Sequence, residues 1–343
     1  MDLPATLTDQ EFWRIVTEFS EPGGVFQPEF MSNEDSSQFV IPTLKQTTRP
    51  GGVYIGVGPE QNFTYIAAIR PNIAFIVDIR RDNMLEHLMY KALFELSGDR
   101  ADFISHLFSR KRPASLDSNS SVNALFDAYK SVEPDPALYE ETVRVVWTHL
   151  ATKHRFPLSD LDKAGIANLM NTFRFAGPYL LRGTGDTNLT YASSMTATDL
   201  TGGQQSYLGS EQKFKLVQDL QKRNLILPLV GDFAGPKTIM SIGRYVEDHS
   251  ATVDVFYVSN VERYLWEQGD HGKQFYANAK MLPINTSSTF IRSVTSDISR
   301  RLGVGLPIGV ANWRSFLSPI SDSLRAFAEG RVHSYREMFE IVR

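Results

Sequence analysis

The 343-residue sequence predicts an α/β fold with a mostly parallel sheet, helices on both faces and a large helical insertion between the second and third strands. Three observations lead to this prediction. A strand–turn–helix–strand pattern occupies residues 51–78, a long stretch of helical periodicity follows it, and further apolar runs of strand length come only after residue 220. Strands that alternate with helices are typical of parallel α/β folds.

The pattern at 51–78 is the most informative part of the chain. A short β-rich run at 52–55 leads into a turn with Gly56 and Gly58, and a helix with an apolar face follows. The run 73–77 is wholly apolar, as expected for a parallel strand buried on both faces, and Asp78 stands at its carboxyl end. An acidic residue about 20 residues beyond a glycine turn is typical of nucleotide-binding βαβ units.

The residue types of this unit suit a nucleotide-like ligand. Glycines let backbone amides approach the ligand, and a carboxylate such as Asp78 accepts ribose hydroxyl groups. The dinucleotide pattern would place a third glycine at position 61, where the chain has Gln61, and this departure weakens the prediction of NAD or FAD. A plain βαβ unit with a tight turn and no ligand is the alternative.

The glycine turn and Asp78 resemble the first two motifs of class I (Rossmann-like) S-adenosylmethionine-dependent methyltransferases. The resemblance implies a Rossmann-like sheet with S-adenosylmethionine as cofactor. In that family the turn passes under the amino-acid part of the cofactor, and the acid holds the ribose. The first-half cofactor contacts that the resemblance implies are Gly56, Gly58, Glu60, Asp78 and Ile79.

The resemblance extends to two later strand ends. Asp232, with Phe233 beside it, stands where the family hydrogen-bonds the adenine, and Ser259 and Asn260 stand where it places the reaction centre. With Glu262 one turn further on, Ser259 and Asn260 form the predicted catalytic group. The family's Asn/Asp-Pro-Pro-aromatic motif is absent, so the methyl acceptor, a small molecule or a protein, stays open. Asn260 is alternatively a simple helix cap.

Four segments are expected along the chain. Residues 1–50 form a helical lid segment, 51–98 the first half of the sheet domain, 99–206 the helical insertion with a long loop, and 207–343 the second half. The capping-box spacing of Thr8 and Glu11 predicts a helix near the start.

Two segments are expected to cover the cofactor or the acceptor. Asn33, Glu34 and Gln38 are candidate lid contacts to the cofactor, although a capped surface helix explains the same residues. The loop at 176–203, with Thr190 and Tyr191, is the candidate cover for the acceptor, because loops of this length are usually functional.

Two further sequence features concern phosphate and metal binding. Residues 231–238 come close to the phosphate loop G-x-x-x-x-G-K-[ST], but Pro236 removes an amide where the loop needs donors. His149 and His154 are five residues apart around a helix end, a spacing that suits no common metal pair, so solvated or structural roles are expected and no metal site is predicted.

Composition limits the remaining possibilities. A net charge of −4 argues against a dedicated nucleic-acid binder, and no apolar run approaches the ~20 residues of a membrane span. Cysteine is absent and the first residues lack the pattern of a signal peptide, so a cytoplasmic protein is expected. The whole chain also resembles a bacterial protein family of unassigned activity. A non-enzymatic ligand-binding or interaction protein is the alternative to a methyltransferase, and the oligomeric state is left open.

Overall fold

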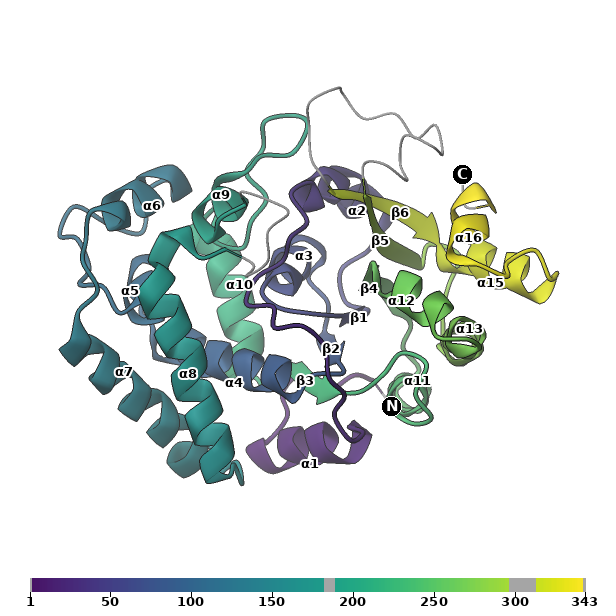
Figure 1. The fold of residues 1–343 in the computed structure, drawn as a ribbon, viewed down its shortest axis with the longest axis horizontal. Helices are drawn as coiled ribbons and strands as arrows, with labels where there is room; N and C mark the ends of the chain where they lie inside the picture. The colour runs from purple at the N-terminus through teal and green to yellow at the C-terminus, as the bar shows by residue number, and fades with distance from the viewer. Residues whose placement is uncertain (1, 182–188, 296–312, 342–343) are drawn as a thin grey trace.

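The computed structural model describes residues 2–181, 189–295 and 313–341, and its centre is a six-stranded sheet (Figure 1). The strands lie in the order β3-β2-β1-β4-β5-β6, and β6 alone runs antiparallel to its neighbour among these six. The fold is therefore mixed α/β with a mostly parallel sheet, as predicted. The strands span β1 Val53–Gly56, β2 Ile73–Asp78, β3 Ile226–Val230, β4 Val253–Ser259, β5 Thr289–Thr295 and β6 Trp313–Pro319.

The strand order reverses beside β1. The chain builds β1, β2 and β3 outward in one direction and then returns to add β4 and β5 on the other side of β1. The connections that leave β1 and β4 therefore go to opposite sides, and a crevice opens between their carboxyl ends. In open α/β sheets this reversal point is where ligands bind.

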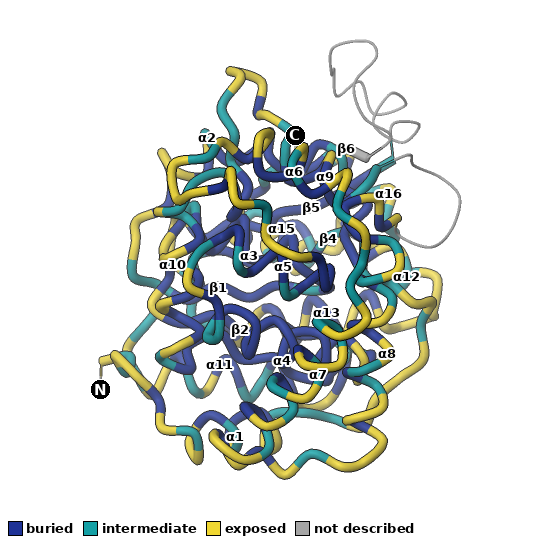
Figure 2. Tube along the Cα trace, turned by 90° about the vertical axis from the view of Figure 1, so that its left-hand side faces the viewer, coloured by how far each residue is buried: buried dark blue, intermediate teal, exposed yellow. Residues whose placement is uncertain are grey.

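Helices cover both faces of the sheet. Tyr65 of α3 meets the ring of Tyr257 on β4, with centroids 5.0 Å apart, and Phe275 of α13 meets Phe256 of the same strand at 6.1 Å. Successive strand residues point to opposite faces, so α3 and α13 pack against opposite sides. Strands β1 and β2 are buried at every position, as Figure 2 shows.

The first helices of the chain flank the sheet domain. The capping box at Thr8 is present and begins α1, as predicted. The α-helices of this part and the short 3-10 helix η1 are α1 Asp9–Phe19, η1 Ser37–Val40, α2 Ile41–Thr47 and α3 Gln61–Ile69.

A long helical stretch separates β2 from β3 in the chain. Helices α4 and α10 pack on each other close to the sheet, and α7 and α8 pack outside α4 at one side of the molecule (Figure 1). The elements are α4 Arg81–Leu96, α5 Arg100–Phe108, α6 Val122–Lys130, α7 Pro136–Thr148, η2 His149–Lys153, α8 Asp160–Ala176, η3 Gly177–Tyr179, α9 Tyr191–Thr196 and α10 Glu211–Lys222. The element η2 is a π-helical turn.

The last helices gather at the opposite side of the sheet in Figure 1. They are α11 Thr238–Asp248, α12 Val261–Glu267, α13 His271–Ala279, α15 Ile320–Ala328 and α16 Tyr335–Ile341. Among the described parts of the chain, every helix is too short or too polar to cross a bilayer.

Three local differences from the sequence analysis have physical reasons. The edge strand β6 was not predicted, because the sequence around it shows no clear alternation. Pro228 is tolerated because β3 is the other edge strand of the sheet, where one side of its backbone has no strand partner among the described residues. The expected loop 176–203 includes η3 and α9, and its residues 182–188 lie outside the described residues.

Candidate functional site

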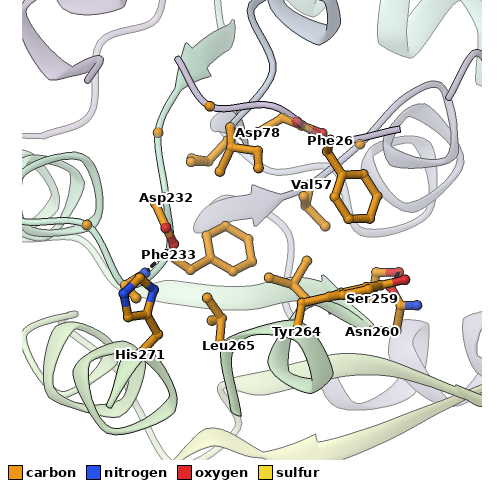
Figure 3. A pocket seen from close by; sticks show the side chains of 18 of the residues that line it. Phe26, Val57, Asp78, Asp232, Phe233, Ser259, Asn260, Tyr264, Leu265 and His271 are labelled. Carbon is orange, nitrogen blue, oxygen red and sulfur yellow. Dashed lines mark hydrogen bonds between the residues drawn. The ribbon is translucent and has the colours of Figure 1, made fainter. Parts of the chain in front are cut away.

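A cleft of about 650 Å³ opens at the carboxyl ends of β1, β2, β3 and β4 (Figure 3). Its floor is formed by the residues that follow these four strands, and its rim is formed by residues 21–33 and by α12. Eight residues that the sequence analysis singled out line it: Asn33, Gly58, Asp78, Ile79, Asp232, Phe233, Ser259 and Asn260. The topology therefore brings together residues from four strand ends and from the N-terminal segment.

The two glycines of the first turn have different roles. Gly58 adopts φ +73°, a left-handed conformation that favours glycine, and nothing lies within 4 Å of the place its Cβ would take. Gly56 does not line the cleft. A Cβ there would lie 1.9 Å from Oδ1 of Asn62, so this glycine permits close packing beneath the turn. Of these two glycines, Gly58 is therefore the one whose backbone lines the cleft.

Two buried side chains hold this turn, and the sequence analysis missed both. The amide of Asn62 donates to the carbonyl oxygens of Val57, Gly58 and Pro59 at 2.7–3.0 Å. Nε2 of His87 lies 2.9 Å from the Gly58 carbonyl oxygen and donates to it as the neutral imidazole, because burial lowers the pKa of His87 to about 4. Residue spacing alone could not identify them, since both act through tertiary contacts.

Asp78 lines the cleft, but its carboxylate already has a partner. Oδ1 accepts hydrogen bonds from the Arg80 backbone amide at 2.8 Å and from Nε at 3.1 Å, and Oδ2 accepts from Nη2 at 2.9 Å. A carboxylate offers about four lone-pair positions, so one position is left. The prediction that Asp78 accepts two ribose hydroxyls therefore requires Arg80 to give up a contact.

The end of β3 contributes a polar and an apolar group. Oδ1 of Asp232 accepts from the Ala234 amide at 2.8 Å, which leaves Oδ2 to face the cleft or solvent. The Phe233 ring packs edge-on against Phe256 at 4.9 Å and is part of the floor. With Ile79 at the end of β2, this floor suits a flat apolar group next to polar atoms.

The end of β4 has a distorted backbone. Ser259 has φ +51°, which is uncommon for a residue other than glycine and is often found at functional sites. Its hydroxyl donates to Oε1 of the buried Glu34, whose pKa is raised by burial, and Tyr257 donates to the same oxygen at 2.8 Å. Asn260 occupies the N-cap position of α12 without a side-chain capping bond, so its amide is not used as a cap.

The N-terminal segment crosses the rim of the cleft. Its backbone is fixed to two strand ends, because the Glu21 amide donates to the Val230 carbonyl at 2.8 Å and the Gly24 amide to the Ile79 carbonyl at 2.7 Å. Phe26 then meets the ring of Tyr264 on α12 at 5.1 Å, at the mouth of the cleft (Figure 3). Tyr264, Gln268 and His271 are further lining residues that the sequence analysis did not name.

Glu262 lies outside the cleft, which corrects its predicted catalytic role. Its carboxylate is buried and paired with the fully buried Arg292, with Oε2 2.6 Å from Nε. Tyr276 also donates to Oε1 at 2.8 Å. Because Glu262 is on the inner face of α12, it binds structural partners and cannot reach a ligand.

Two predicted cofactor contacts also lie away from the cleft. The Gln38 amide donates to the Ser194 carbonyl at 3.0 Å, and its oxygen accepts from the Gln205 amide at 2.7 Å. Glu60 is fully buried behind the turn, where its carboxyl group accepts from the Ser32 amide. Neither side chain lines the cleft.

The two residues predicted to cover the acceptor also lie away from the cleft. Thr190 is the N-cap of α9, and Tyr191 is fully buried with its hydroxyl against that of Tyr207. The ring of Tyr191 packs among Phe108, Phe126 and Phe173. These two residues are therefore part of the insertion core and do not face the cleft.

In the segment that resembles a phosphate loop, a carboxylate of the chain occupies the place of a phosphate. Oε1 of Glu21 accepts from the backbone amides of Lys237 at 2.9 Å and of Thr238 at 2.7 Å, and Lys237 donates to the Ser20 carbonyl. The amides at the N-terminus of α11 are those that a phosphate would use. Since a carboxylate of the chain already holds them, a phosphate would have to displace it.

Charge gives the cleft its chemical preference. Four carboxylate side chains line it, and the described lining residues include no Lys or Arg: the acids are Glu21, Glu29, Asp78 and Asp232. Apolar residues such as Val57, Phe233 and Leu265 form much of the remaining wall. The negative charge of this lining, which Arg80 offsets at Asp78, disfavours a ligand rich in phosphate relative to a neutral or cationic ligand with an apolar ring.

Comparison with known proteins assigns the chain to a family. The family profile described as Domain of unknown function (DUF7790) matches residues 30–156 and 181–339. These ranges include most of the chain, so the protein belongs to this family. Among curated proteins the comparison finds no match.

Proposed function

We propose that the cleft binds S-adenosylmethionine and that the protein is a Rossmann-like methyltransferase acting on a small-molecule or protein acceptor. The observation that carries the proposal is the convergence of Gly58, Asp78, Asp232 and Asn260 on one acid-lined cleft at the strand-order reversal. The volume of about 650 Å³ lies in the ~300–1,000 Å³ range of small-molecule sites.

The available groups fit the parts of this cofactor. The open backbone at Gly58 suits close approach of its amino-acid part, and the remaining lone pair on Asp78 suits one ribose hydroxyl. Phe233 and Ile79 offer apolar surface next to Asp232 for the adenine. The absence of Lys and Arg from the described lining favours a cationic sulfonium over a dinucleotide or ATP.

When bound, S-adenosylmethionine would supply an electrophilic methyl group, and the chain's residues would align the acceptor with it. Asn260 is the candidate for this alignment, because its amide faces the cleft without a capping bond. The N-terminal segment, with Phe26 against Tyr264, would limit access of water.

A ligand-binding protein without catalysis is the second candidate, and one observation favours it. The Ser259 hydroxyl donates to Glu34, and Glu262 is paired with Arg292 outside the cleft. Of the three predicted catalytic side chains, Asn260 therefore remains. An acceptor that carries no proton to be removed would need no base, so alignment by Asn260 is sufficient for such a substrate.

The experiment that tests the site compares two charge-matched variants in titrations with S-adenosylmethionine. Asp78→Asn keeps the shape and one oxygen that accepts from Arg80, but it loses the charge-assisted bond to the ribose. Because it also leaves the buried Arg80 guanidinium without its anion, the Tm of the variant is measured first, and Kd is compared in the folded protein. Such a bond contributes about 1.5–3 kcal/mol, so Kd should rise roughly 10- to 150-fold.

Asp82→Asn is the matched control, because Asp82 is exposed on α4 and lies outside the cleft lining. It should bind like the wild type. An unchanged Kd in Asp78→Asn would remove Asp78 from the site. Loss of affinity in both variants would show that the effect is one of overall charge.

A further inference from the structure

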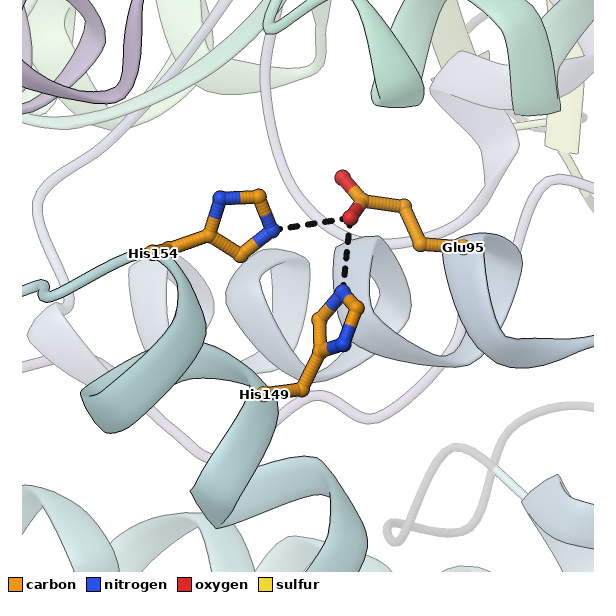
Figure 4. A group of neighbouring side chains, drawn as sticks. All are labelled: Glu95, His149 and His154. Atoms are coloured by element: carbon orange, nitrogen blue, oxygen red, sulfur yellow. Dashed lines mark hydrogen bonds and ion pairs between the residues drawn. The ribbon is translucent and has the colours of Figure 1, made fainter.

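A second cluster of ligand-type side chains lies far from the cleft lining, between α1, α4 and the π-turn η2. Glu95, in the last turn of α4, faces His149 and His154, and none of the three lines the cleft (Figure 4). Their side chains are 5%, 6% and 7% exposed. One ligand atom from each lies within 4.8 Å of the others.

The π-turn explains how histidines five residues apart come together. The His154 amide donates to the His149 carbonyl at 3.0 Å, an i→i+5 bond in place of the α-helical i→i+4 bond. The wider turn places His154 over His149, with ring centroids 4.9 Å apart. The two imidazoles therefore lie together although a spacing of five residues matches no common metal pair. Single π-turns are frequently found at functional sites.

The contacts of Glu95 and His154 leave a proton to be accounted for. Oε2 of Glu95 lies 2.7 Å from Nε2 of His149 and 2.8 Å from Nε2 of His154, while Nδ1 of His154 lies 2.7 Å from Oδ1 of Asp9. A neutral imidazole has one N–H, so a neutral His154 can donate to only one of its two carboxylates. A metal ion between Nε2 of His154 and Oε2 of Glu95 would leave the single N–H of the imidazole, on Nδ1, for Asp9.

The surrounding groups are arranged as in metal sites. A carboxylate on the far nitrogen of a metal-bound histidine fixes its tautomer, and Asp9 has that position relative to His154. Asp9 is itself held by the Asn224 amide at 2.9 Å. Lys91 donates to Oε1 of Glu95 at 2.6 Å, which directs Oε2 to the histidines.

We propose that Glu95, His149 and His154 form a binding site for a divalent transition-metal ion of the zinc class. Two imidazoles and one carboxylate are a set that zinc uses, whereas calcium and magnesium prefer oxygen ligands. Zinc distances of about 2.0–2.2 Å place tetrahedral ligand atoms roughly 3.3 Å apart, so each Nε2 would move about half an ångström from Oε2. The ion would join α1, through Asp9, to α4 and the π-turn.

The test uses the full chain without a histidine tag, stripped with EDTA and then titrated with zinc chloride. One zinc per chain is expected, with a rise in Tm that EDTA reverses. Cobalt(II) at the same site should give visible absorption bands typical of tetrahedral coordination. A flat zinc titration and a Tm that zinc leaves unchanged would overturn the proposal and identify the cluster as an imidazolium–carboxylate network.

Variants locate the ion. His149→Ala and Glu95→Gln should each abolish the cobalt bands, and Asp9→Asn should weaken zinc binding about 10- to 100-fold, as loss of a histidine-orienting carboxylate does. His333→Ala, which alters an exposed histidine, is the matched control. If the core variants do not fold, the wild-type titration and Asp9→Asn still decide. Zinc affinity equal to that of the wild type in Asp9→Asn and in folded Glu95→Gln would place the ion elsewhere and contradict the proposal.

Discussion

At the scale of single residues, burial shifts the pKa values of two polar groups near the first glycine turn toward their neutral forms. Burial raises the pKa of Glu60 to about 8, and burial lowers the pKa of His87 to about 4. Both side chains are therefore neutral near pH 7. The turn that supports Gly58 is held by neutral hydrogen-bonding groups, which avoids the cost of an unpaired buried charge.

Glu60 should make stability depend on pH. An unfolded Glu has a pKa near 4.3, so between about pH 4.5 and 8 the folded state holds one more proton than the unfolded state. The contribution of Glu60 to the free energy of unfolding is thus fully present below about pH 4.5 and is lost as pH rises through 8. Glu60→Gln should reduce this slope and raise Tm at pH 8.

The control for this prediction is Glu18→Gln, because Glu18 is exposed on α1. Its profile of Tm against pH should follow the wild type. Identical slopes for Glu60→Gln and the wild type would contradict a neutral Glu60.

At the scale of elements, strand ends and helix starts determine which side chains reach the cleft. Asn260 and Glu262 are two residues apart, yet the first lines the cleft and the second is buried against Arg292. Both were predicted to lie in the site, because the sequence indicates where β4 ends but not which face of α12 is turned toward the cleft. The π-turn at His149 was likewise not predicted, because residue spacing alone does not reveal its backbone hydrogen bonds.

Replacement of Asn260 tests whether it is a cap. Loss of a capping side chain costs about 1 kcal/mol, but Asn260 makes no capping bond. Asn260→Ala should therefore change the free energy of unfolding by less than about 0.5 kcal/mol in denaturant titrations. Ser121→Ala is the control, because Ser121 does cap α6 by accepting from the Ala124 amide at 3.1 Å. Equal losses in the two variants would make Asn260 a cap.

The Glu262–Arg292 pair should contribute to the stability of the fold and not to ligand binding. Glu262→Gln leaves a buried guanidinium without its anion, which costs about 3–5 kcal/mol, so unfolding should shift to lower denaturant. Glu262→Gln with Arg292→Met should recover part of this loss, because the unpaired charge is gone. Affinity for S-adenosylmethionine should match the wild type in the folded variants. Normal stability with lost affinity in Glu262→Gln would return Glu262 to the site.

At the scale of the whole molecule, sequence patterns were sufficient for the central strands and insufficient for the surroundings. The glycine turn, β2 and Asp78 lie close in sequence, so their relation could be predicted from local patterns. The pairing of Asp78 with Arg80 and of Glu21 with the start of α11 depends on side-chain direction and on contacts across the chain. For this reason eight of the predicted site residues line the cleft, while others, such as Glu262 and Gln38, bind partners elsewhere in the protein.

The charge of the cleft makes a prediction about ligand class that concerns the whole fold. Four carboxylates with no Lys or Arg in the described lining favour a cationic or neutral ligand, and the Glu21 carboxylate holds the amides that a phosphate would need. A mostly parallel α/β sheet could otherwise serve NAD, ATP or S-adenosylmethionine equally well.

The most direct test of S-adenosylmethionine binding is a set of calorimetric titrations of the wild-type chain with S-adenosylmethionine, NAD and magnesium ATP under the same conditions. We expect saturable binding of one S-adenosylmethionine per chain and no heat of binding from NAD or ATP. Binding of NAD or ATP in its place, or a flat titration with millimolar S-adenosylmethionine, would contradict this expectation.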